Sequence, residues 1–395
     1  MTRTICAKTR LMTIRLPDKP MTASAKRVLV FRNGSLGDTC IAIPALRLVR
    51  QHFSSADIRV LTNFPIDGGL KAAPLHSVIG QSGLVDGYFD YPLGLKQWAD
   101  LLTCRKTLQQ WRPEVLIYMM PVRSSLQLFR DLLYFKFVVG IPKIIGLSLN
   151  SKAQPHLWDE KTGLFEAEAH RLVRNLAVLG EIDLQSEAAW DLGLKTDETV
   201  RAANILQNWA GAGRYIVCSI GAKWESKDWG LDRWEQWAAA FSQRFPDYGL
   251  ALIGSNIEKT HCDSVARLWK GPTLNLCGML TPRESAWVIG QAQCFVGHDS
   301  GPMHLGAAVG TPCVALFSAQ DKPGIWFPYG NRHQVIYHKT DCFGCLLEQC
   351  NVPEKPCMRS ISVDEVISAT ERALGKACGI SSSIATFSLP QANSD

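Results

Sequence analysis

The chain has 395 residues, of which 46% are hydrophobic, and its formal net charge is +6. A chain of this length can bury two ordinary hydrophobic cores, so we expect two domains. No apolar run approaches the roughly 18 to 20 residues of a membrane-spanning helix. No tract of lysine and arginine indicates nucleic-acid binding, so we expect no nucleic-acid partner. The small positive charge suits phosphorylated or anionic-lipid substrates, but it is equally compatible with a solvated surface that has no such role.

The two ends of the chain are predicted to lie outside the folded part. Residues 1–25 contain five basic side chains but no unbroken apolar core, so they are not a secretory signal. We expect them to be a disordered leader or an incorrectly assigned start, and we expect residues 379–395 to be a disordered tail. Thirteen cysteines in a chain without a signal indicate a reducing cytoplasm, and therefore thiols or a metal site rather than disulfides.

The residue pattern at the start of the folded part predicts a strand, a helix and a second strand. Residues 27–32 form a short apolar run whose valines favour a strand. Residues 39–53 have apolar side chains at helical spacing, although Pro44 predicts a late helix start or a kink. Residues 58–62 are predicted to form the second strand, which completes a β-α-β unit.

The loop of this unit, Asn33-Gly34-Ser35-Leu36-Gly37-Asp38, is a candidate ligand-binding loop. It is not the dinucleotide fingerprint, because no third glycine follows at the required spacing. Gly34, Ser35 and Gly37 would allow a ligand to approach the backbone closely and would present the carboxylate of Asp38 at a helix N-terminus. The alternative is that Asp38 only caps the helix, although a cap does not require two glycines.

The rest of the first half continues this alternation. Strands are predicted at residues 115–120 and 140–146, and a helix at 170–179, where His170 and Arg171 have packing roles. The amphipathic stretch 126–137 is rich in leucine and aromatic residues. It is either a core helix or a helix that borders a lipid or amphiphile groove.

A polar connector between residues 181 and 201 marks the boundary between two domains. We assign residues 26–190 to the first domain, 191–205 to a linker and 206–378 to the second domain. A second series of strands follows, at residues 215–220, 250–254, 274–277, 294–296 and, as the last one, 312–317. The predicted fold class is therefore α/β, with two doubly wound, Rossmann-like domains and a ligand cleft between them.

The stretch 296–305 follows one of these strands and leads into a helix. A polar loop in this position places backbone N–H groups at the carboxyl edge of a sheet, where anions bind. Capping would account for Asp299, Ser300 and Pro302, but it gives no reason for His304. We therefore predict a ligand-binding loop.

Taken together and in order, these motifs resemble the heptosyltransferase family of glycosyltransferases, which builds the inner core of lipopolysaccharide. The resemblance extends from about Arg27 to about Val366. Its most specific parts are the motifs at 32–38 and 299–305, supported by Gly221-Ala222, by Lys227-Asp228-Trp229 and by the closing motif at 357–361. Three positions depart from the usual family pattern, namely His298, Gly306 and Ser318.

The resemblance implies a GT-B enzyme that inverts the anomeric centre of an ADP-linked heptose without a catalytic cofactor. The first domain would bind the acceptor and the second the nucleotide. Asp38 would be the general base, Lys227 would contact the phosphates and Glu258 would hold the ribose. The diphosphate and sugar would be held by the loop Asp299, Ser300, Gly301, Pro302, Met303 and His304.

These roles are chemically consistent. Inversion requires one base that faces the anomeric carbon and a stabilised leaving diphosphate opposite it. Lys227 and the helix N-terminus after Ser300 can neutralise the departing ADP. The expected partners are ADP-heptose and a lipid-linked oligosaccharide, which is lipid A–Kdo or core oligosaccharide. The expected location is peripheral, at the cytoplasmic face of the inner membrane.

Two other functions stay open on the sequence. One is transfer of another nucleotide sugar to O-antigen, another glycan or a protein. The other is a non-catalytic protein that binds nucleotide sugars, although such a protein would not need the base Asp38. A dinucleotide oxidoreductase is disfavoured, because the three-glycine fingerprint is missing.

A cysteine-rich loop at residues 342–357 is a candidate structural metal site. Cys342, Cys345, Cys350 and Cys357 lie within sixteen residues, and four thiolates can hold a tetrahedral zinc or iron ion. The first pair has the spacing of a metal site, but the later spacings are not those of a standard ribbon. The alternative is that these are reduced thiols in a loop packed over the nucleotide domain.

Overall fold

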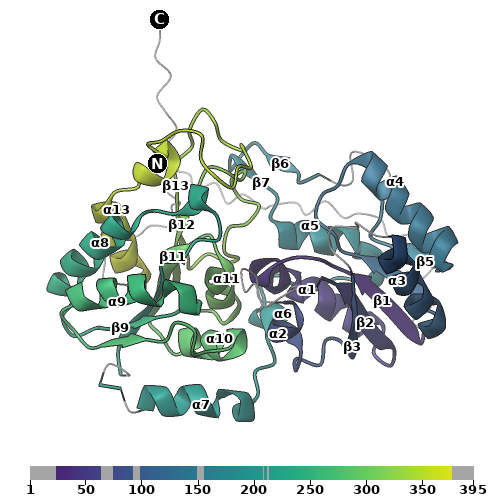
Figure 1. Cartoon of the computed structure of the whole chain (residues 1–395), viewed down its shortest axis with the longest axis horizontal. Coiled ribbons are helices and arrows are strands. Elements are labelled where there is room, and N and C mark those ends of the chain that lie inside the picture. Colours follow the sequence, from purple (N-terminus) through teal and green to yellow (C-terminus); the bar gives the residue numbers. More distant parts are fainter. Residues whose placement is uncertain are drawn as a thin grey trace, which may run out of the picture.

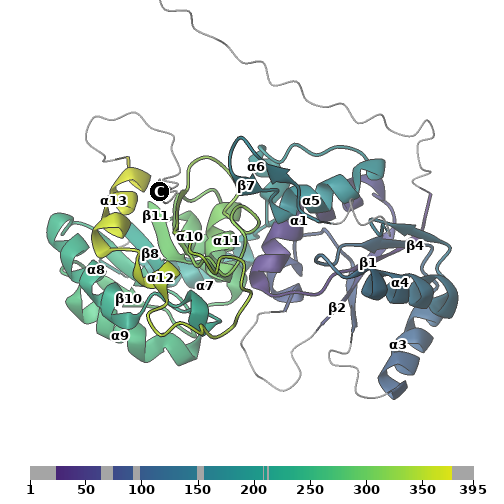
Figure 2. The same ribbon diagram turned by 90° about the horizontal axis from the view of Figure 1, so that it is seen from above.

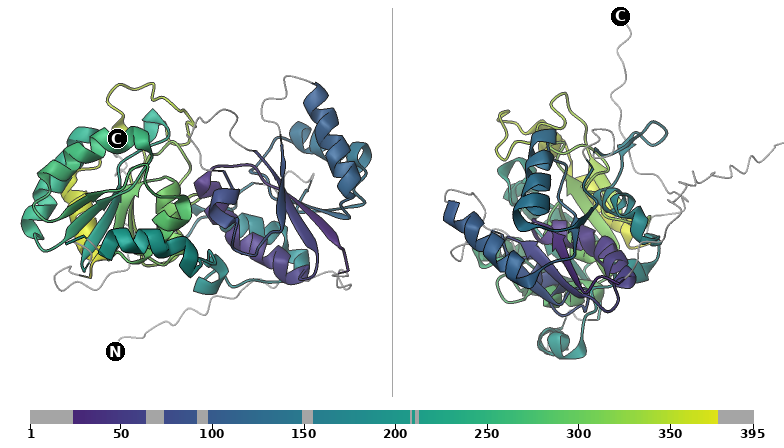
Figure 3. Two further views of the ribbon diagram at one scale, coloured as in Figure 1. Left: turned by 60° about the horizontal axis from the view of Figure 1, so that its bottom comes forward. Right: turned by 90° about the vertical axis from the view of Figure 1, so that its right-hand side faces the viewer.

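The computed structural model describes residues 24–63, 74–91, 98–148, 155–207, 209–210 and 213–375. Residues 1–23 of the predicted leader and the whole predicted tail, 379–395, lie outside these ranges. The described residues form two α/β halves side by side, each a parallel sheet flanked by helices (Figures 1 and 3). The predicted fold class is confirmed.

The first half contains a five-stranded parallel sheet in the order β3-β2-β1-β4-β5. Its strands are β1 (Arg27–Phe31), β2 (Asp57–Thr62), β3 (Gly87–Asp90), β4 (Val115–Tyr118) and β5 (Lys143–Ile145). Val30 in the central strand lies opposite Val60 on one side and Ile117 on the other. All three are buried, because helices cover both faces of the sheet and apolar side chains therefore occupy both.

The helices of this half are α1 (Leu36–His52), α2 (His76–Ile79), α3 (Trp98–Trp111), α4 (Ser125–Leu133), α5 (Glu168–Asn175) and α6 (Glu187–Trp190). A π-helical turn, η1 (Tyr134–Val139), extends α4, a 3-10 turn, η2 (Ala177–Leu179), follows α5, and β6 (Trp158–Asp159) pairs with β7 (Leu164–Phe165). The late helix start predicted from Pro44 is wrong, since α1 begins at Leu36 and contains Pro44 in its interior.

The second half contains a six-stranded parallel sheet in the order β10-β9-β8-β11-β12-β13. Its strands are β8 (Tyr215–Ser219), β9 (Gly249–Leu252), β10 (Thr273–Asn275), β11 (Cys294–His298), β12 (Cys313–Phe317) and β13 (Gln334–Tyr337). The prediction that residues 312–317 form the last strand is wrong, because β13 pairs with β12 and forms an edge of the sheet. Its first two residues are only partly buried, so it lacks the apolar run of a central strand.

The helices of the second half are α7 (Thr196–Gln207), α8 (Leu231–Arg244), α9 (Lys259–Leu268), α10 (Pro282–Gly290), α11 (Gly301–Ala308), α12 (Pro356–Arg359) and α13 (Val363–Ala373), with short 3-10 turns η3 (Glu225–Lys227) and η4 (Asn256–Glu258). Three tryptophans pack in the core of this half. Trp234 meets Trp229 and Trp237 edge to face, with ring centroids 4.8 and 5.9 Å apart. None of the three is exposed.

The connection between the halves is helical. Most of the predicted linker, residues 191–205, lies in α7, which packs against α10. Arg283 of α10 is almost completely buried at this connection. Its guanidinium donates to the carbonyl oxygens of Val78 (2.7 Å) and Leu192 (2.9 Å) and to the carboxylate of Glu198 (2.6 Å). The exact domain boundaries stay predictions.

A buried ionic cluster lies below the first glycine loop. Arg32 donates to the carbonyl oxygen of Met119 (2.7 Å), and its Nη1 is 3.3 Å from Glu168 of α5. Glu168 also accepts from Arg171, at 2.6 and 2.7 Å. These charges compensate one another, as buried charges must. The packing role predicted for Arg171 is confirmed.

Helix α1 lies at the centre of the molecule. It contacts α5 and α6 within the first half and α11 from the second half, as the positions of α1 and α11 in Figures 1 and 2 show. Eleven of its 17 residues are buried. Among the described residues, no helix combines the length and apolar character needed to cross a membrane.

Candidate active site

A cleft of about 890 Å³ lies between the carboxyl ends of the two sheets. Both halves contribute to its walls. The predicted site residues that line it are Ser35, Gly37, Asp38, Lys227, Glu258, Asp299, Ser300, Gly301, Pro302 and His304. Gly34 and Met303 do not line it. Met303 is buried in the hydrophobic core. Gly34 has no side chain, and the carboxylate of Asp38 lies in the space that a β-carbon would fill.

The two carboxylate oxygens of Asp38 differ in their contacts: Oδ2 accepts hydrogen bonds, whereas Oδ1 has only a longer ionic contact. Its Oδ2 accepts from the backbone N–H of Ser35 (2.7 Å) and from the Ser35 hydroxyl (2.8 Å), so Asp38 does form a helix cap. Its Oδ1 is 3.7 Å from Arg32 Nη2, beyond hydrogen-bond distance. A β-carbon on Gly34 would overlap the Asp38 side chain, which explains this glycine. Capping and a chemical role for Asp38 are therefore compatible.

The two candidate loops touch each other across the cleft. A β-carbon on Gly37 would overlap the edge of the His304 ring, and one on Gly301 would overlap Leu36. Both glycines are thus required for close contact between the halves. Burial lowers the pKa of His304, and the carboxylates of Asp299 and Asp38 oppose this only partly, so the ring is neutral at pH 7.

Lys227 is held by two carboxylates. Its Nζ is 2.6 Å from Asp299 Oδ2 and 3.0 Å from Asp321 Oδ2, and 5.1 Å from the centre of the Trp224 ring. Burial disfavours the ammonium, but the two carboxylates outweigh burial and raise the pKa of Lys227 above its ordinary value. Burial raises the pKa of Asp321, against the opposing effect of Lys227. The result is a permanently charged lysine in the cleft wall.

Glu258 lies in the wall formed by the second sheet. Its Oε2 accepts from the backbone N–H (2.5 Å) and the hydroxyl (3.1 Å) of Ser255. A β-carbon on Gly221 or on Gly254 would overlap the Glu258 carboxylate. The two glycines after β8 and β9 therefore create the space that this carboxylate occupies.

The N-terminus of α11 faces the cleft. Ser300 occupies the N-cap position, but its side chain makes no capping hydrogen bond, and its hydroxyl is buried without a partner. The alternative explanation, that this hydroxyl caps the helix, is therefore wrong. Pro302 lies in the first turn, as expected. An unpartnered hydroxyl beside free backbone N–H groups is available to an anionic ligand.

The four cysteines of the candidate metal site are not brought together. Cys342 and Cys345 are exposed, Cys350 is half-buried, and Cys357 is buried with its Sγ 3.6 Å from the Ser318 hydroxyl. Within the described ranges, no three histidine, cysteine or acidic side chains are grouped as metal ligands. The thiols as arranged do not form the tetrahedral site that zinc or iron requires.

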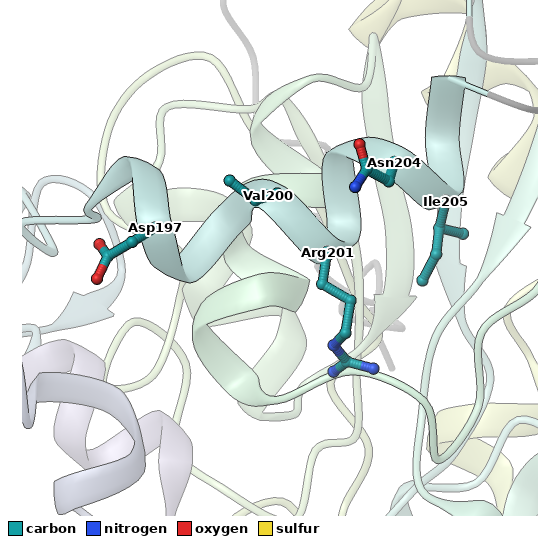
Figure 4. A pocket seen from close by; sticks show the side chains of 5 residues that line it. All are labelled: Asp197, Val200, Arg201, Asn204 and Ile205. Atoms are coloured by element: carbon teal, nitrogen blue, oxygen red, sulfur yellow. The ribbon is translucent and has the colours of Figure 1, made fainter.

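A second hollow, of about 520 Å³, lies on α7 (Figure 4). It is lined by Asp197, Val200, Arg201, Asn204 and Ile205. Arg201 pairs with Glu284 of α10 at 2.5 Å. None of the predicted site residues lines this hollow, so we assign no chemistry to it.

Sequence reasoning missed Asp321 and Trp224, which both contact Lys227. Asp321 comes four residues after β12, near the carboxyl edge of the second sheet, and that position was the available signal.

Of the three departures from the family pattern, none lines the cleft. Gly306 packs against Cys313, Ser318 lies beside Cys357, and His298 is buried below the cleft wall.

The fold and the two-sided cleft define a structural class, the GT-B proteins, in which two Rossmann-like domains face each other across a cleft. A crystal structure of a family 9 glycosyl transferase from Veillonella parvula superposes with a TM-score of 0.65 at 18% identity, covering 89% of this chain and 98% of that one. Escherichia coli ADP-heptose LPS heptosyltransferase II superposes with a TM-score of 0.59 at 16% identity, covering 89% and 99%.

The sequence comparisons agree. Residues 134–355 match the model of glycosyltransferase family 9 (heptosyltransferase). Lipooligosaccharide heptosyltransferase 2 of Campylobacter jejuni is 24% identical over 347 residues, which cover 86% of this chain and 95% of that protein. The chain belongs to glycosyltransferase family 9.

Proposed function

We propose that this glycosyltransferase moves heptose from ADP-heptose, with inversion, to an inner-core acceptor of lipopolysaccharide, either lipid A–Kdo or core oligosaccharide. The observation that carries the proposal is the placement of Asp38 and Lys227 on opposite halves of one cleft. The names of the similar proteins support the sugar and the acceptor, because the Campylobacter jejuni and Escherichia coli proteins are heptosyltransferases of lipooligosaccharide and lipopolysaccharide.

In this mechanism Asp38 is the general base. Its Oδ1 accepts the proton of the acceptor hydroxyl as that oxygen attacks the anomeric carbon and the bond to ADP breaks. Arg32 lies below the carboxylate, with its Nη2 3.7 Å from Asp38 Oδ1. Attack from the side of Asp38, opposite the leaving ADP, inverts the anomeric centre.

The leaving diphosphate is stabilised by the second half. Lys227 supplies a fixed positive charge, and the N-terminus of α11 supplies backbone N–H groups and the Ser300 hydroxyl. Asp299 and Asp321 hold the lysine, and the diphosphate would share it with them. These groups neutralise the developing charge, so the proposal requires no catalytic metal. Glu258 would accept hydrogen bonds from the ribose hydroxyls.

The acceptor would be presented at the cytoplasmic face of the inner membrane. The segment α4–η1 exposes Leu126, Phe129, Leu133 and Phe137, at 79%, 49%, 39% and 72% of their surface. Their spacing is helical, and we call them the α4 stripe. An amphipathic helix of this kind lies in the interface of a membrane.

Charge and position both favour an anionic membrane as the occupant of the α4 stripe. Residues 98–146 contain seven lysines and arginines against three acids. Helix α4 follows β4, which is paired in parallel with β1, so the stripe begins near the sheet edge that carries Asp38. Figure 1 places α4 on the outer side of the first half, away from the second half.

A ligand screen by thermal shift tests the proposed donor. A ligand that binds the native state raises its melting temperature. We expect ADP to raise the melting temperature, and UDP and NAD to leave it unchanged. Incubation with ADP-heptose and a lipid A–Kdo acceptor should then release ADP. A shift with UDP instead of ADP would show that the donor is a different nucleotide sugar, and ADP binding without transfer would favour a binding protein.

We retain a structural zinc or iron ion at Cys342, Cys345, Cys350 and Cys357 only as a proposal with its own test. It would require the loop to rearrange so that all four thiolates meet. Metal analysis of the purified protein measures it, and clearly less than one equivalent would refute it.

A further inference from the structure

His298 is a buried histidine with a defined partner on each ring nitrogen. It lies at the end of β11 with no exposed surface, and its ring meets that of Trp234 edge to face at 5.2 Å. Its Nε2 is 3.0 Å from the backbone nitrogen of Trp229, and its Nδ1 is 3.3 Å from the carbonyl oxygen of Gly221. The segment 221–229 contains Lys227.

The partners fix the tautomer of this ring. A backbone N–H can only donate, so Nε2 must accept from Trp229 and carries no proton. The proton of the neutral ring is then on Nδ1, which donates to Gly221. Burial lowers the pKa of His298, which agrees with a neutral ring. Both ring nitrogens are therefore used by backbone groups at the two ends of one segment.

These two ends lie beside different parts of the donor site. Gly221 borders the carboxylate of Glu258, since a β-carbon there would overlap it. Trp229 follows Lys227 by two residues. Between these ends the segment forms the turn η3, in which the N–H groups of Lys227 and Asp228 donate to the carbonyls of Trp224 (3.0 Å) and Glu225 (3.1 Å). Ser226 in the middle of the segment is also held from outside, because its N–H donates to the Glu348 carbonyl (3.2 Å) and its hydroxyl to the Leu347 carbonyl (2.6 Å).

We propose that His298 is a positioning residue for donor binding, which sets the Gly221 end of segment 221–229 against the ribose site and the Trp229 end against the phosphate site. The inference rests on the proposed function for the roles of Glu258 and Lys227. His298 itself touches no substrate, because it does not line the cleft.

Two substitutions separate the two contacts. The Asn side-chain amide occupies the place of histidine Nδ1, so His298→Asn can still donate to Gly221 but cannot reach Trp229. The Gln amide reaches the place of Nε2, so His298→Gln can still accept from Trp229 but does not bond Gly221. His298→Ala removes both contacts.

The matched control is His333, a half-buried histidine of the second half. Its ring bonds the backbone nitrogen of Cys313 (3.2 Å) and the carbonyl oxygen of Tyr329 (2.9 Å), and it does not line the cleft. His333→Asn and His333→Gln remove similar contacts at a distance from segment 221–229. They report the loss of stability caused by replacing a histidine whose two ring nitrogens bond backbone groups.

The first readout needs no ligand. Trypsin cleaves after Lys223 and Lys227 when the segment is released, and cleavage tracks the population of the open form. We expect cleavage there to be roughly tenfold faster in each single-contact variant, as expected for the loss of about one hydrogen bond, and faster still in His298→Ala, which loses both. The His333 variants should leave it unchanged. Equal cleavage in wild type and His298→Ala would overturn the proposal.

The second readout is the affinity for adenosine and ADP, measured by calorimetry. His298→Asn should weaken ADP roughly tenfold and adenosine by less than about twofold, because only the Lys227 end is released. His298→Gln should weaken both by the same factor. Identical patterns for Asn and Gln would overturn the separation of the two ends. If wild type prefers UDP to ADP, the proposed donor fails, and the cleavage result still decides the role of His298.

Discussion

The Cα of Gly37 on α1 lies directly against the imidazole of His304 on α11, so that a β-carbon at residue 37 would be 2.8 Å from the ring Cδ2. Asp38 is the next residue along the chain. The contact between Gly37 and His304 therefore sets the distance between the base Asp38 and the donor side of the cleft.

Gly37→Ala should separate the base from the donor. The added methyl group overlaps the ring, so α1 and α11 must move apart by a few tenths of an ångström or more. Misplacement of reacting groups is costly, and we expect kcat to fall roughly tenfold to a hundredfold with little change in ADP affinity. Steady-state kinetics and calorimetry measure the two. Gly213→Ala is the control, because a β-carbon there meets nothing within 4 Å. Unchanged kcat in Gly37→Ala would contradict the requirement for close contact.

Asp38→Asn should abolish transfer while ADP-heptose still binds. The amide oxygen can keep accepting from Ser35, but the group can no longer take a proton. We expect kcat to fall by roughly 10²-fold to 10⁴-fold. The exposed residue Asp247 gives a control, Asp247→Asn, which should be fully active. Wild-type activity in Asp38→Asn would refute Asp38 as the base.

Lys227→Met should weaken ADP binding roughly tenfold to a hundredfold, because a charge-assisted contact contributes about 1.5 to 3 kcal/mol. The substitution also leaves Asp299 and Asp321 unpaired beside the phosphates. Since the pKa of Lys227 is raised, the lysine stays charged and its contribution to ADP affinity in the wild type should persist without loss up to pH 10. Calorimetry at several pH values checks both points. The control is Lys270→Met, at an exposed lysine, which should bind ADP like wild type. Wild-type ADP affinity in Lys227→Met would contradict the assignment of Lys227 to the phosphates.

Glu168→Gln should destabilise the protein in a pH-dependent way. Burial raises the pKa of Glu168, but hydrogen bonds and charge from Arg171 and Arg32 outweigh it and lower the pKa below its ordinary 4.5. A carboxyl with a lowered folded pKa adds stability above its unfolded pKa, and this is lost as the pH falls through the folded pKa.

At pH 7 the variant should therefore lose about 3 to 5 kcal/mol of unfolding free energy, since two guanidinium groups lose their buried partner. The difference from wild type should shrink below pH 4.5. Urea denaturation at pH 7 and at acidic pH measures it, with Glu181→Gln at an exposed position as control. A difference that does not change with pH would argue against the ionic origin.

The α4 stripe predicts binding to anionic membranes. The double variant Leu126→Ser and Phe137→Ser should bind vesicles rich in phosphatidylglycerol at least roughly tenfold more weakly, because two exposed apolar side chains are lost. Neutral phosphatidylcholine vesicles should bind wild type weakly. Val200→Ser with Leu268→Ser is the matched control, since these apolar side chains are exposed on α7 and α9. Equal binding of both double variants in cosedimentation would exclude the stripe as the membrane surface.

The sequence predicted the fold wherever strands are buried on both faces. The strands β1, β4 and β8 are apolar except for Arg27 and Ser219 at their ends, and every residue but Arg27 is buried. The edge strands β3 and β13 were missed, because a half-exposed strand of four residues has no such run.

Residues of the site were predictable where they occupy motifs. Asp38 and Asp299 follow strands within recognisable loops, whereas Asp321 belongs to no motif. The pairing of Arg32 with Glu168 joins positions 136 residues apart, which no local pattern encodes. The role of His298 was likewise hidden, because it depends on backbone groups more than 60 residues earlier in the chain.

The central position of α1 also affects how the chain is made. All five strands of the first sheet are present once Ile145 has been synthesised, but α11, which covers part of α1, begins only at Gly301. At about 5 to 20 residues per second, the completed first sheet and α1 wait roughly 8 to 30 s on the ribosome for this partner. During that time apolar surface of α1 is open to chaperones and to aggregation. Slower translation of the second half should therefore lower the yield of folded protein more than slower translation of the first.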